Sequence, residues 1–157
     1  MIEIERKFLV ISDKFKTEAF KKVEIKQGYL NSHPERTTRI RVQDKAAFIT
    51  VKGKSSDSGL SRFEWEKEIP VEEALELLKL CEPGVIEKVR YLVKAGEFTF
   101  EIDEFFGDNS GLVMTEIELR SEEDTFTKPA WLGEQVTGDK RYYNSQLSKN
   151  PFKNWGK

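Results

Sequence analysis

The feature that most constrains the fold of this 157-residue chain is a series of short segments whose side chains alternate in character at every second residue. This period of two is typical of β-strands, because successive side chains point to opposite faces of a sheet. Turn residues separate most of the segments by hairpin-sized gaps. The pattern predicts eight strands, at Glu3–Val10, Val23–Leu30, Thr37–Gln43, Ala46–Gly53, Ser61–Ile69, Val85–Val93, Glu97–Phe105 and Val113–Arg120.

Helical spacing is confined to three short segments, so the fold class is α+β and mainly β. The segments are Val71–Leu80 after Pro70, a weaker Lys14–Lys22, and a final Asp139–Leu147 in which Asp139 is the expected N-cap. Residues 149–157 are expected to form a loose tail of a single domain that spans residues 1–157.

Eight sequential antiparallel strands favour a closed up-and-down or meander β-barrel. Closure removes the exposed strand edges that invite aggregation. A barrel of eight strands has room inside for one small ligand.

Charged side chains fall on one face of most predicted strands, and apolar side chains fall on the other face. A charged face is usually solvated, but here basic and acidic residues segregate by strand, and arginine is used where bidentate phosphate binding would need it. Inside a barrel such charges would require counter-charges, which a polyphosphate and a divalent cation supply. The charged face comprises Glu3, Glu5 and Lys7; Arg39 and Arg41; Thr50 and Lys52; Arg62, Glu64 and Glu66; Lys88 and Arg90; Glu101 and Asp103; and Glu116 and Glu118.

Composition excludes several kinds of site. Cys81 is the only cysteine and His33 the only histidine, which excludes an intrachain disulfide and disfavours a zinc site or a Ser-His-Asp triad. Any metal should therefore be a hard cation held by carboxylates. The net charge of −2 argues against a nucleic-acid binder with a basic face. The charged N-terminus and the lack of long apolar runs predict a cytoplasmic protein without membrane contact.

An ordered set of short motifs resembles one known family from end to end. The set begins with Glu3-Ile4-Glu5-Arg6-Lys7, which has the form ExExK, and it resembles the CYTH superfamily, the triphosphate tunnel metalloenzymes, in particular its short bacterial members. One departure is Phe100, where many members carry tryptophan. The further motifs are Gln27-Gly28-Tyr29-Leu30, Arg39-x-Arg41, Thr50-Val51-Lys52, Glu64-x-Glu66, Lys88-x-Arg90, Glu101-Ile102-Asp103-x-Phe105, Glu116-Ile117-Glu118-Leu119 and Thr137-Gly138-Asp139-Lys140-Arg141-Tyr142.

The resemblance implies a closed eight-stranded antiparallel barrel that forms a tunnel, with Mg²⁺ or Mn²⁺ as cofactor. It implies a catalytic role near the attacking water for Lys7 and Tyr29, although a packing role is commoner for a strand tyrosine. It implies that the triphosphate is bound by Lys7, Arg39, Arg41, Lys52, Lys88 and Arg90. It implies that the metal is held by Glu3, Glu5, Asp103, Glu116 and Glu118, with Glu64 and Glu66 as weaker candidates.

Three functions fit these residues. The first is a metal-dependent hydrolase that cleaves inorganic tripolyphosphate to pyrophosphate and phosphate by attack of water. The second is a nucleoside- or thiamine-triphosphate enzyme of the same superfamily, including class IV adenylyl cyclase. The third is a non-catalytic polyphosphate-binding module, which would not need the clustered carboxylates. The expected partner is a small-molecule triphosphate, and a homodimer is left open.

Overall fold

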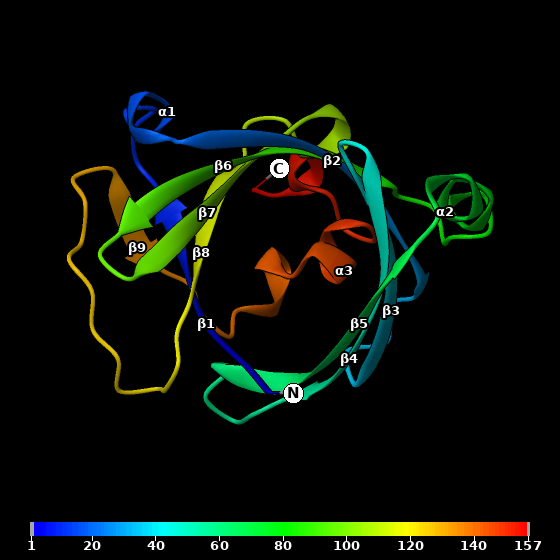
Figure 1. The fold of residues 1–157 in the computed structure, drawn as a ribbon, viewed down its shortest axis with the longest axis horizontal. Coiled ribbons are helices and arrows are strands. Elements are labelled where there is room, and N and C mark those ends of the chain that lie inside the picture. The colour runs from blue at the N-terminus through cyan, green and yellow to red at the C-terminus, as the bar shows by residue number, and fades with distance from the viewer. Residues whose placement is uncertain (1, 157) are drawn as a thin grey trace.

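The computed structural model describes residues 2–156, and its strands form one antiparallel sheet that closes on itself (Figure 1). Closure arises because β1 pairs with β8 on one side and with β5 on the other. A ninth strand pairs only with β1, outside the ring. The strands are β1 Ile2–Val10, β2 Lys21–Asn31, β3 Arg36–Gln43, β4 Ala46–Ser55, β5 Ser61–Ile69, β6 Ile86–Ala95, β7 Phe98–Phe105, β8 Val113–Glu118 and β9 Leu132–Gln135.

The order of the strands around the barrel differs from the predicted meander. Hydrogen-bonded neighbours follow the order β5-β4-β3-β2-β6-β7-β8-β1-β9, so β1 does not pair with β2 and β5 does not pair with β6. The helix α1 (Phe15–Glu18) lies in the first crossing and α2 (Val71–Leu78) in the second. Alternation specifies which face a side chain occupies but not which strand lies alongside, so the sequence pattern could not reveal these crossings.

All eight predicted strands are confirmed, with ends that shift by a few residues. The predicted helix Lys14–Lys22 is wrong beyond Glu18, because the chain already belongs to β2 from Lys21. The predicted helix Asp139–Leu147 is broken by extended backbone at Tyr143 into the 3-10 turn η2 (Lys140–Tyr142) and the helix α3 (Asn144–Leu147). Asp139 does cap the first turn, since its Oδ1 accepts from the Arg141 N–H at 3.1 Å.

Much of the hydrophobic core lies outside the barrel wall. The apolar faces of β1, β7 and β8 contribute Phe8, Phe100 and Ile117 to a buried cluster with Phe15 of α1 and Trp131. Trp131 is fully buried and its Nε1 donates to Glu18 Oε1 at 3.1 Å, which confirms its expected packing role. The helix α2 covers the opposite wall, where Ala74 and Leu78 pack with Ile40 of β3 and Ala47 of β4 (Figure 1). Because the strands pack outward in this way, their other face is free to carry charge.

The C-terminal residues close one end of the lumen, where α3 lies within the ring of strands (Figure 1). Tyr142 and Leu147 are buried here, in a cluster with Ile86, Phe105 and Met114 of the wall. Part of the predicted loose tail at residues 149–157 packs against the barrel, and residue 157 lies outside the described residues. Phe152 and Trp155 pack against this cluster, and the Trp155 and Tyr142 rings lie 5.1 Å apart in an edge-to-face contact. Within residues 2–156 no helix is long and apolar enough to cross a membrane.

Candidate functional site

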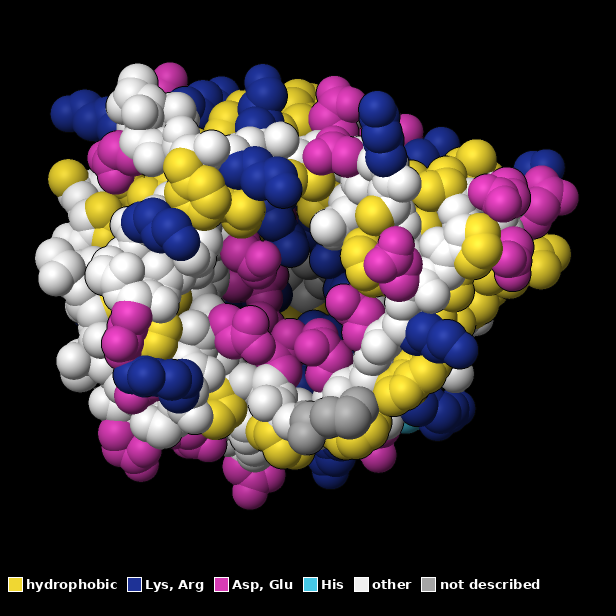
Figure 2. Space-filling model, in the orientation of Figure 1, with side chains coloured by type: hydrophobic (Ala, Val, Ile, Leu, Met, Phe, Trp, Pro, Cys, Tyr) yellow, Lys and Arg dark blue, Asp and Glu magenta, His cyan; other side chains and the backbone are white. Residues whose placement is uncertain are grey.

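The charged faces of the strands point into the lumen, as the sequence predicts, and form two adjoining hollows. The inner cavity, of about 70 Å³, lies next to the C-terminal segment. The outer hollow, of about 290 Å³, forms an acidic mouth that opens on the face shown in Figure 2. Both hollows are lined by Glu5, Arg39, Arg41, Lys52 and Glu116. The lumen thus runs from an acidic rim to a largely basic interior.

Arg39 has a donor that the protein leaves without an acceptor. Its Nη2 donates to Thr50 Oγ1 at 3.0 Å and lies 3.5 Å from Glu66 Oε2. Its buried Nε has no partner among the residues that the structure describes. Buried polar atoms nearly always have a hydrogen-bond partner, so this orphan donor points to a bound acceptor that the protein itself does not supply.

Two buried cations carry pKa values below their ordinary range. Burial, together with the nearby Arg39 and Arg90, lowers the pKa of Arg41 to about 9. Burial lowers the pKa of Lys88 to about 7, and the attraction of Asp103 only partly opposes this shift. The lowered pKa values show that positive charge is costly here until a counter-charge arrives. A bound polyanion would provide that charge.

Asp103 lies among the basic residues and apart from the other predicted metal ligands. Its two oxygens accept from Arg90 at 2.8 and 2.9 Å, and Lys88 Nζ lies 2.8 Å from its Oδ2. Burial alone would raise the pKa of this carboxyl, but the two cations outweigh it and hold the pKa at about 2. Both carboxylate oxygens are therefore already used by protein cations in this structure.

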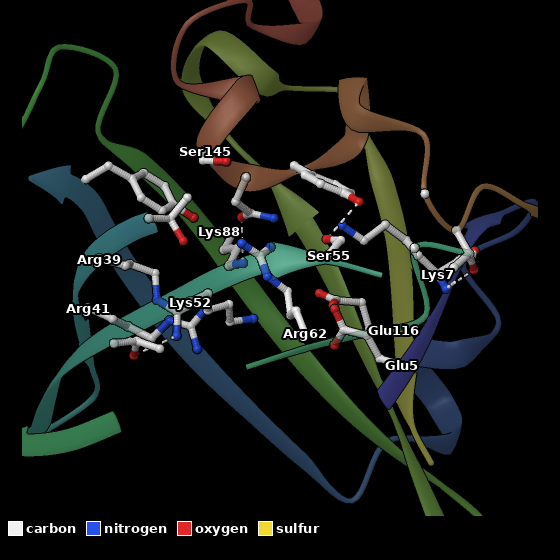
Figure 3. A pocket seen from close by; sticks show the side chains of 18 residues that line it. Glu5, Lys7, Arg39, Arg41, Lys52, Ser55, Arg62, Lys88, Glu116 and Ser145 are labelled. Atoms are coloured by element: carbon white, nitrogen blue, oxygen red, sulfur yellow. Dashed lines mark hydrogen bonds between the residues drawn. The ribbon is translucent and has the colours of Figure 1, made fainter. Parts of the chain in front are cut away.

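Glu5 and Glu116 form a close carboxylate pair between β1 and β8 (Figure 3). Burial raises the pKa of Glu5 well above its usual value, and the negative charge of Glu116 adds to the effect. Burial also acts on Glu116, but Lys7 and the hydrogen bond from Glu5 outweigh it and lower the Glu116 pKa. Two carboxyl groups in such close contact share either a proton or a cation.

Further carboxylates lie toward the mouth. Lys52 Nζ donates to the two oxygens of Glu3 at 2.9 and 3.1 Å and lies 3.6 Å from Glu64. Burial and the charge of Glu3 raise the pKa of Glu64 to about 7, and burial likewise raises that of Glu118. Within residues 2–156 no three carboxylate, histidine or cysteine side chains converge as a ready metal cage. The carboxylates lie in pairs instead.

The predicted catalytic residues Lys7 and Tyr29 line the same inner cavity. Lys7 Nζ donates to the Tyr142 carbonyl at 3.0 Å and lies 5.2 Å from the centre of the Tyr143 ring. Tyr29 is buried with 6% of its surface exposed. In the described part of the chain the two side chains share this cavity without a hydrogen bond between them.

Several residues to which the sequence analysis assigned no site role belong to the inner cavity or support it. Gln27, on the same face of β2 as Tyr29, accepts from the cavity residue Arg41 through a hydrogen bond from Nε at 2.8 Å. Alternation along β2 could have identified it. The C-terminal residues could not be placed by any strand pattern, because they reach the lumen from outside the sheet. The additional lining residues are Thr37, Ser55, Gly59, Arg62, Thr137, Gly138, Tyr143, Asn144 and Ser145.

Replacing Asp103 by asparagine should destabilise the barrel strongly. The change leaves Arg90 and Lys88 buried without their counter-charge, which costs about 3–5 kcal/mol in the free energy of unfolding. Urea unfolding at pH 7 would measure the loss. Since the folded-state pKa of about 2 lies below the ordinary value of 3.8, the ionised carboxylate stabilises the fold above about pH 4 and less so as pH falls toward 2.

The exposed pair Lys153–Asp108 offers the matched control. Its side chains keep 57% and 62% of their surface exposed, so Asp108→Asn should change stability by about 1 kcal/mol or less. Equal losses for Asp103→Asn and Asp108→Asn would show that the buried network does not stabilise the fold.

Comparison with known proteins identifies close relatives over almost the whole chain. A CYTH domain model matches residues 1–150. The chain is 51% identical to an inorganic triphosphatase of Acetivibrio thermocellus over 98% of its length and 97% of the relative. It is 40% identical to an inorganic triphosphatase of Nitrosomonas europaea over 94% and 97% of the two chains. A crystal structure of an inorganic triphosphatase superposes with a TM-score of 0.66 at 37% identity, over 93% of this chain and 97% of the other.

Proposed function

Because this chain belongs to the CYTH domain family, we propose that it hydrolyses inorganic tripolyphosphate to pyrophosphate and phosphate inside the barrel. The relatives at 51% and 40% identity bear the name inorganic triphosphatase. The observation that carries the proposal is the inner cavity, where buried lysine and arginine side chains surround a small space and Arg39 keeps an unused donor.

The basic side chains would bind the phosphate oxygens. Arginine offers paired N–H donors to two oxygens at once, and lysine offers a compact charge. The cations of β3, β4 and β6 enter the lumen from neighbouring or nearby strands and so can surround one short chain of phosphates. This role falls to Lys7, Arg39, Arg41, Lys52, Lys88 and Arg90, as the sequence predicts.

A divalent cation fits the paired carboxylates. Magnesium in phosphate-binding sites is usually held by one or two carboxylates together with substrate oxygens and water, so a pair suffices. Glu5 and Glu116 would hold it, with Glu3 and Glu118 nearer the mouth, and Mg²⁺ or Mn²⁺ is the proposed metal. When bound, the ion would neutralise charge that develops on the phosphate oxygens. Asp103, which the family resemblance placed among the metal ligands, would instead orient Arg90 and Lys88.

Within this cavity, Lys7 and Tyr29 would act on the attacking water. As the phenolate, Tyr29 would take a proton from that water and become the neutral phenol, and the surrounding cations would stabilise the negative charge that develops on the oxygen of the water. Burial of both side chains excludes bulk water from the reacting phosphate.

The closed end of the lumen favours the inorganic substrate over a nucleoside or thiamine triphosphate. The free space beside Lys7 and Tyr29 is about 70 Å³, and the C-terminal segment packs against the wall at that end. An organic group would therefore find little room beyond the basic residues on that side.

Phosphorus NMR of the purified protein with tripolyphosphate and Mg²⁺ tests the proposal. We expect the tripolyphosphate signals to disappear while pyrophosphate and phosphate appear in equal amounts. Glu116→Gln should suppress this conversion, and Glu76→Gln, which alters an exposed ion pair on α2, should not. If the wild-type protein leaves tripolyphosphate intact at every divalent metal concentration tested, the proposed function is refuted.

Replacing Arg39 or Arg41 of β3 should weaken catalysis. Arg39→Ala or Arg41→Ala removes charge-assisted hydrogen bonds worth about 1.5–3 kcal/mol each, so kcat/KM should fall by at least about tenfold. The lysine variants should recover only part of this loss, because lysine cannot bind two oxygens bidentately. Steady-state kinetics would measure both, with the exposed Arg120→Ala as control. Lysine variants with wild-type kinetics would contradict the bidentate contact.

A further inference from the structure

Two neutral amides lie between the cations of β3 and β6. β2 lies between these strands in the sheet, and its residue Gln27 is the cross-strand partner of Arg41. Gln27 is completely buried. Its Oε1 accepts from Arg41 Nε at 2.8 Å, and its Nε2 donates to Asn144 Oδ1 at 2.9 Å.

The second amide joins this pair to Lys88. Asn144, the first residue of α3, accepts through the same Oδ1 from Lys88 Nζ at 2.8 Å. An unbroken series of hydrogen bonds therefore runs from Arg41 through Gln27 and Asn144 to Lys88. It continues to Asp103 and Arg90, which lie beyond Lys88.

The donors and acceptors fix the orientation of both amides. Arginine and lysine can only donate, so the oxygen of Gln27 must face Arg41 and its NH₂ group must face Asn144. Asn144 must then present its oxygen to two donors. A glutamate at position 27 could not donate to Asn144, and a lysine could not accept from Arg41. Only an amide satisfies both neighbours while carrying no charge.

Resting on the proposed function, we propose that Gln27 and Asn144 are positioning residues that hold Arg41 and Lys88 for the triphosphate. The two cations repel each other, and the repulsion by Arg41 contributes to the lowered pKa of Lys88. An acceptor is needed to hold them in the lumen before the substrate arrives. A further carboxylate would neutralise charge that must bind phosphate, whereas an amide oxygen orients Arg41 without neutralising it and adds no negative charge beside Lys88, which already pairs with Asp103.

This arrangement gives the C-terminal segment a part in substrate binding. Asn144 follows Tyr143, whose ring lies over Lys7, and Tyr142, whose carbonyl accepts from Lys7. The short stretch 142–144 thus contacts two of the proposed phosphate-binding lysines from the closed end of the barrel. The stretch would hold these lysine side chains in position, and this role requires no charged side chain within residues 142–144.

Kinetics of single and double variants with tripolyphosphate would test the proposal. Gln27→Met has a similar shape but makes neither hydrogen bond, so kcat/KM should fall about tenfold, the scale of one such bond. Since Gln27 acts through Arg41, the same change in an Arg41→Ala background should cost about twofold or less. Asn144→Ala should likewise lose about tenfold alone and about twofold or less in a Lys88→Ala background.

Gln146→Met on α3 is the control and should keep wild-type kinetics. If Gln27 and Asn144 had only a general structural role, each substitution would lower kcat/KM by the same factor in the wild-type protein and in the Arg41→Ala or Lys88→Ala variant. Equal factors would therefore overturn the proposal. Wild-type kinetics in both Gln27→Met and Asn144→Ala would also overturn it. These outcomes are distinct from failure of the proposed function, in which the unmodified protein itself would not hydrolyse tripolyphosphate.

Discussion

Removal of divalent cations is expected to abolish tripolyphosphate hydrolysis. Glu5 and Glu116 lie side by side in the lumen, and Glu64, Glu118 and Glu3 crowd the mouth. Burial and the mutual repulsion of these groups raise the pKa of several of the carboxyls. A cation relieves this crowding and also neutralises the phosphate oxygens of the substrate. Phosphate release should therefore stop in excess EDTA and return when Mg²⁺ or Mn²⁺ is added beyond the chelator.

Carboxylate variants separate a metal requirement from an effect of the chelator. Glu116→Ala and Glu118→Ala should lose activity at every metal concentration while circular dichroism shows an intact fold. Glu72→Ala, on the exposed side of α2, should keep both activity and metal dependence. Full turnover in excess EDTA would eliminate the metal assignment.

Replacing Tyr29 by phenylalanine should lower kcat on tripolyphosphate by at least about a hundredfold, because general-base assistance is typically worth 10²–10⁴-fold. KM should change little, since the phenol is assigned to the water and not to the phosphate oxygens. The buried position of Tyr29 in a cavity lined by Lys7 and Lys88 gives the physical ground for this role. Steady-state kinetics at saturating metal would measure the effect.

Tyr91→Phe is the matched control for this substitution. Tyr91 lies on the outer side of the wall, packed edge-to-face against Phe15 at 5.3 Å, and should tolerate loss of its hydroxyl. If Tyr29→Phe keeps the wild-type kcat, Tyr29 is a packing residue and the attacking water needs no protein base.

The strands and their faces could be predicted from the sequence because both depend on local alternation. In β3, for example, the alternate residues Thr37, Arg39 and Arg41 all line the inner cavity. The number of sequential strands favoured a closed barrel, whereas the inward direction of the charges rested on their segregation by strand and on the family resemblance. The resemblance to a known family added the roles, which no alternation could supply.

Strand order and the closed end could not be predicted, because they depend on contacts between distant residues. β1 pairs with β5 and β8, and no local pattern records that choice. Asn144 reaches Lys88 from 56 positions away along the chain. Asp103 belongs to the charged face as predicted, yet whether it meets a metal or an arginine depends on its neighbours on β6, which the sequence pattern did not place.

The ratio of kcat/KM for tripolyphosphate to that for ATP and thiamine triphosphate, measured under one condition with Mg²⁺, tests the central claim most directly. The small cavity closed by Tyr143 and Asn144 predicts that tripolyphosphate is hydrolysed far more efficiently than either organic triphosphate. A kcat/KM for ATP or thiamine triphosphate that equals or exceeds the kcat/KM for tripolyphosphate would contradict the account.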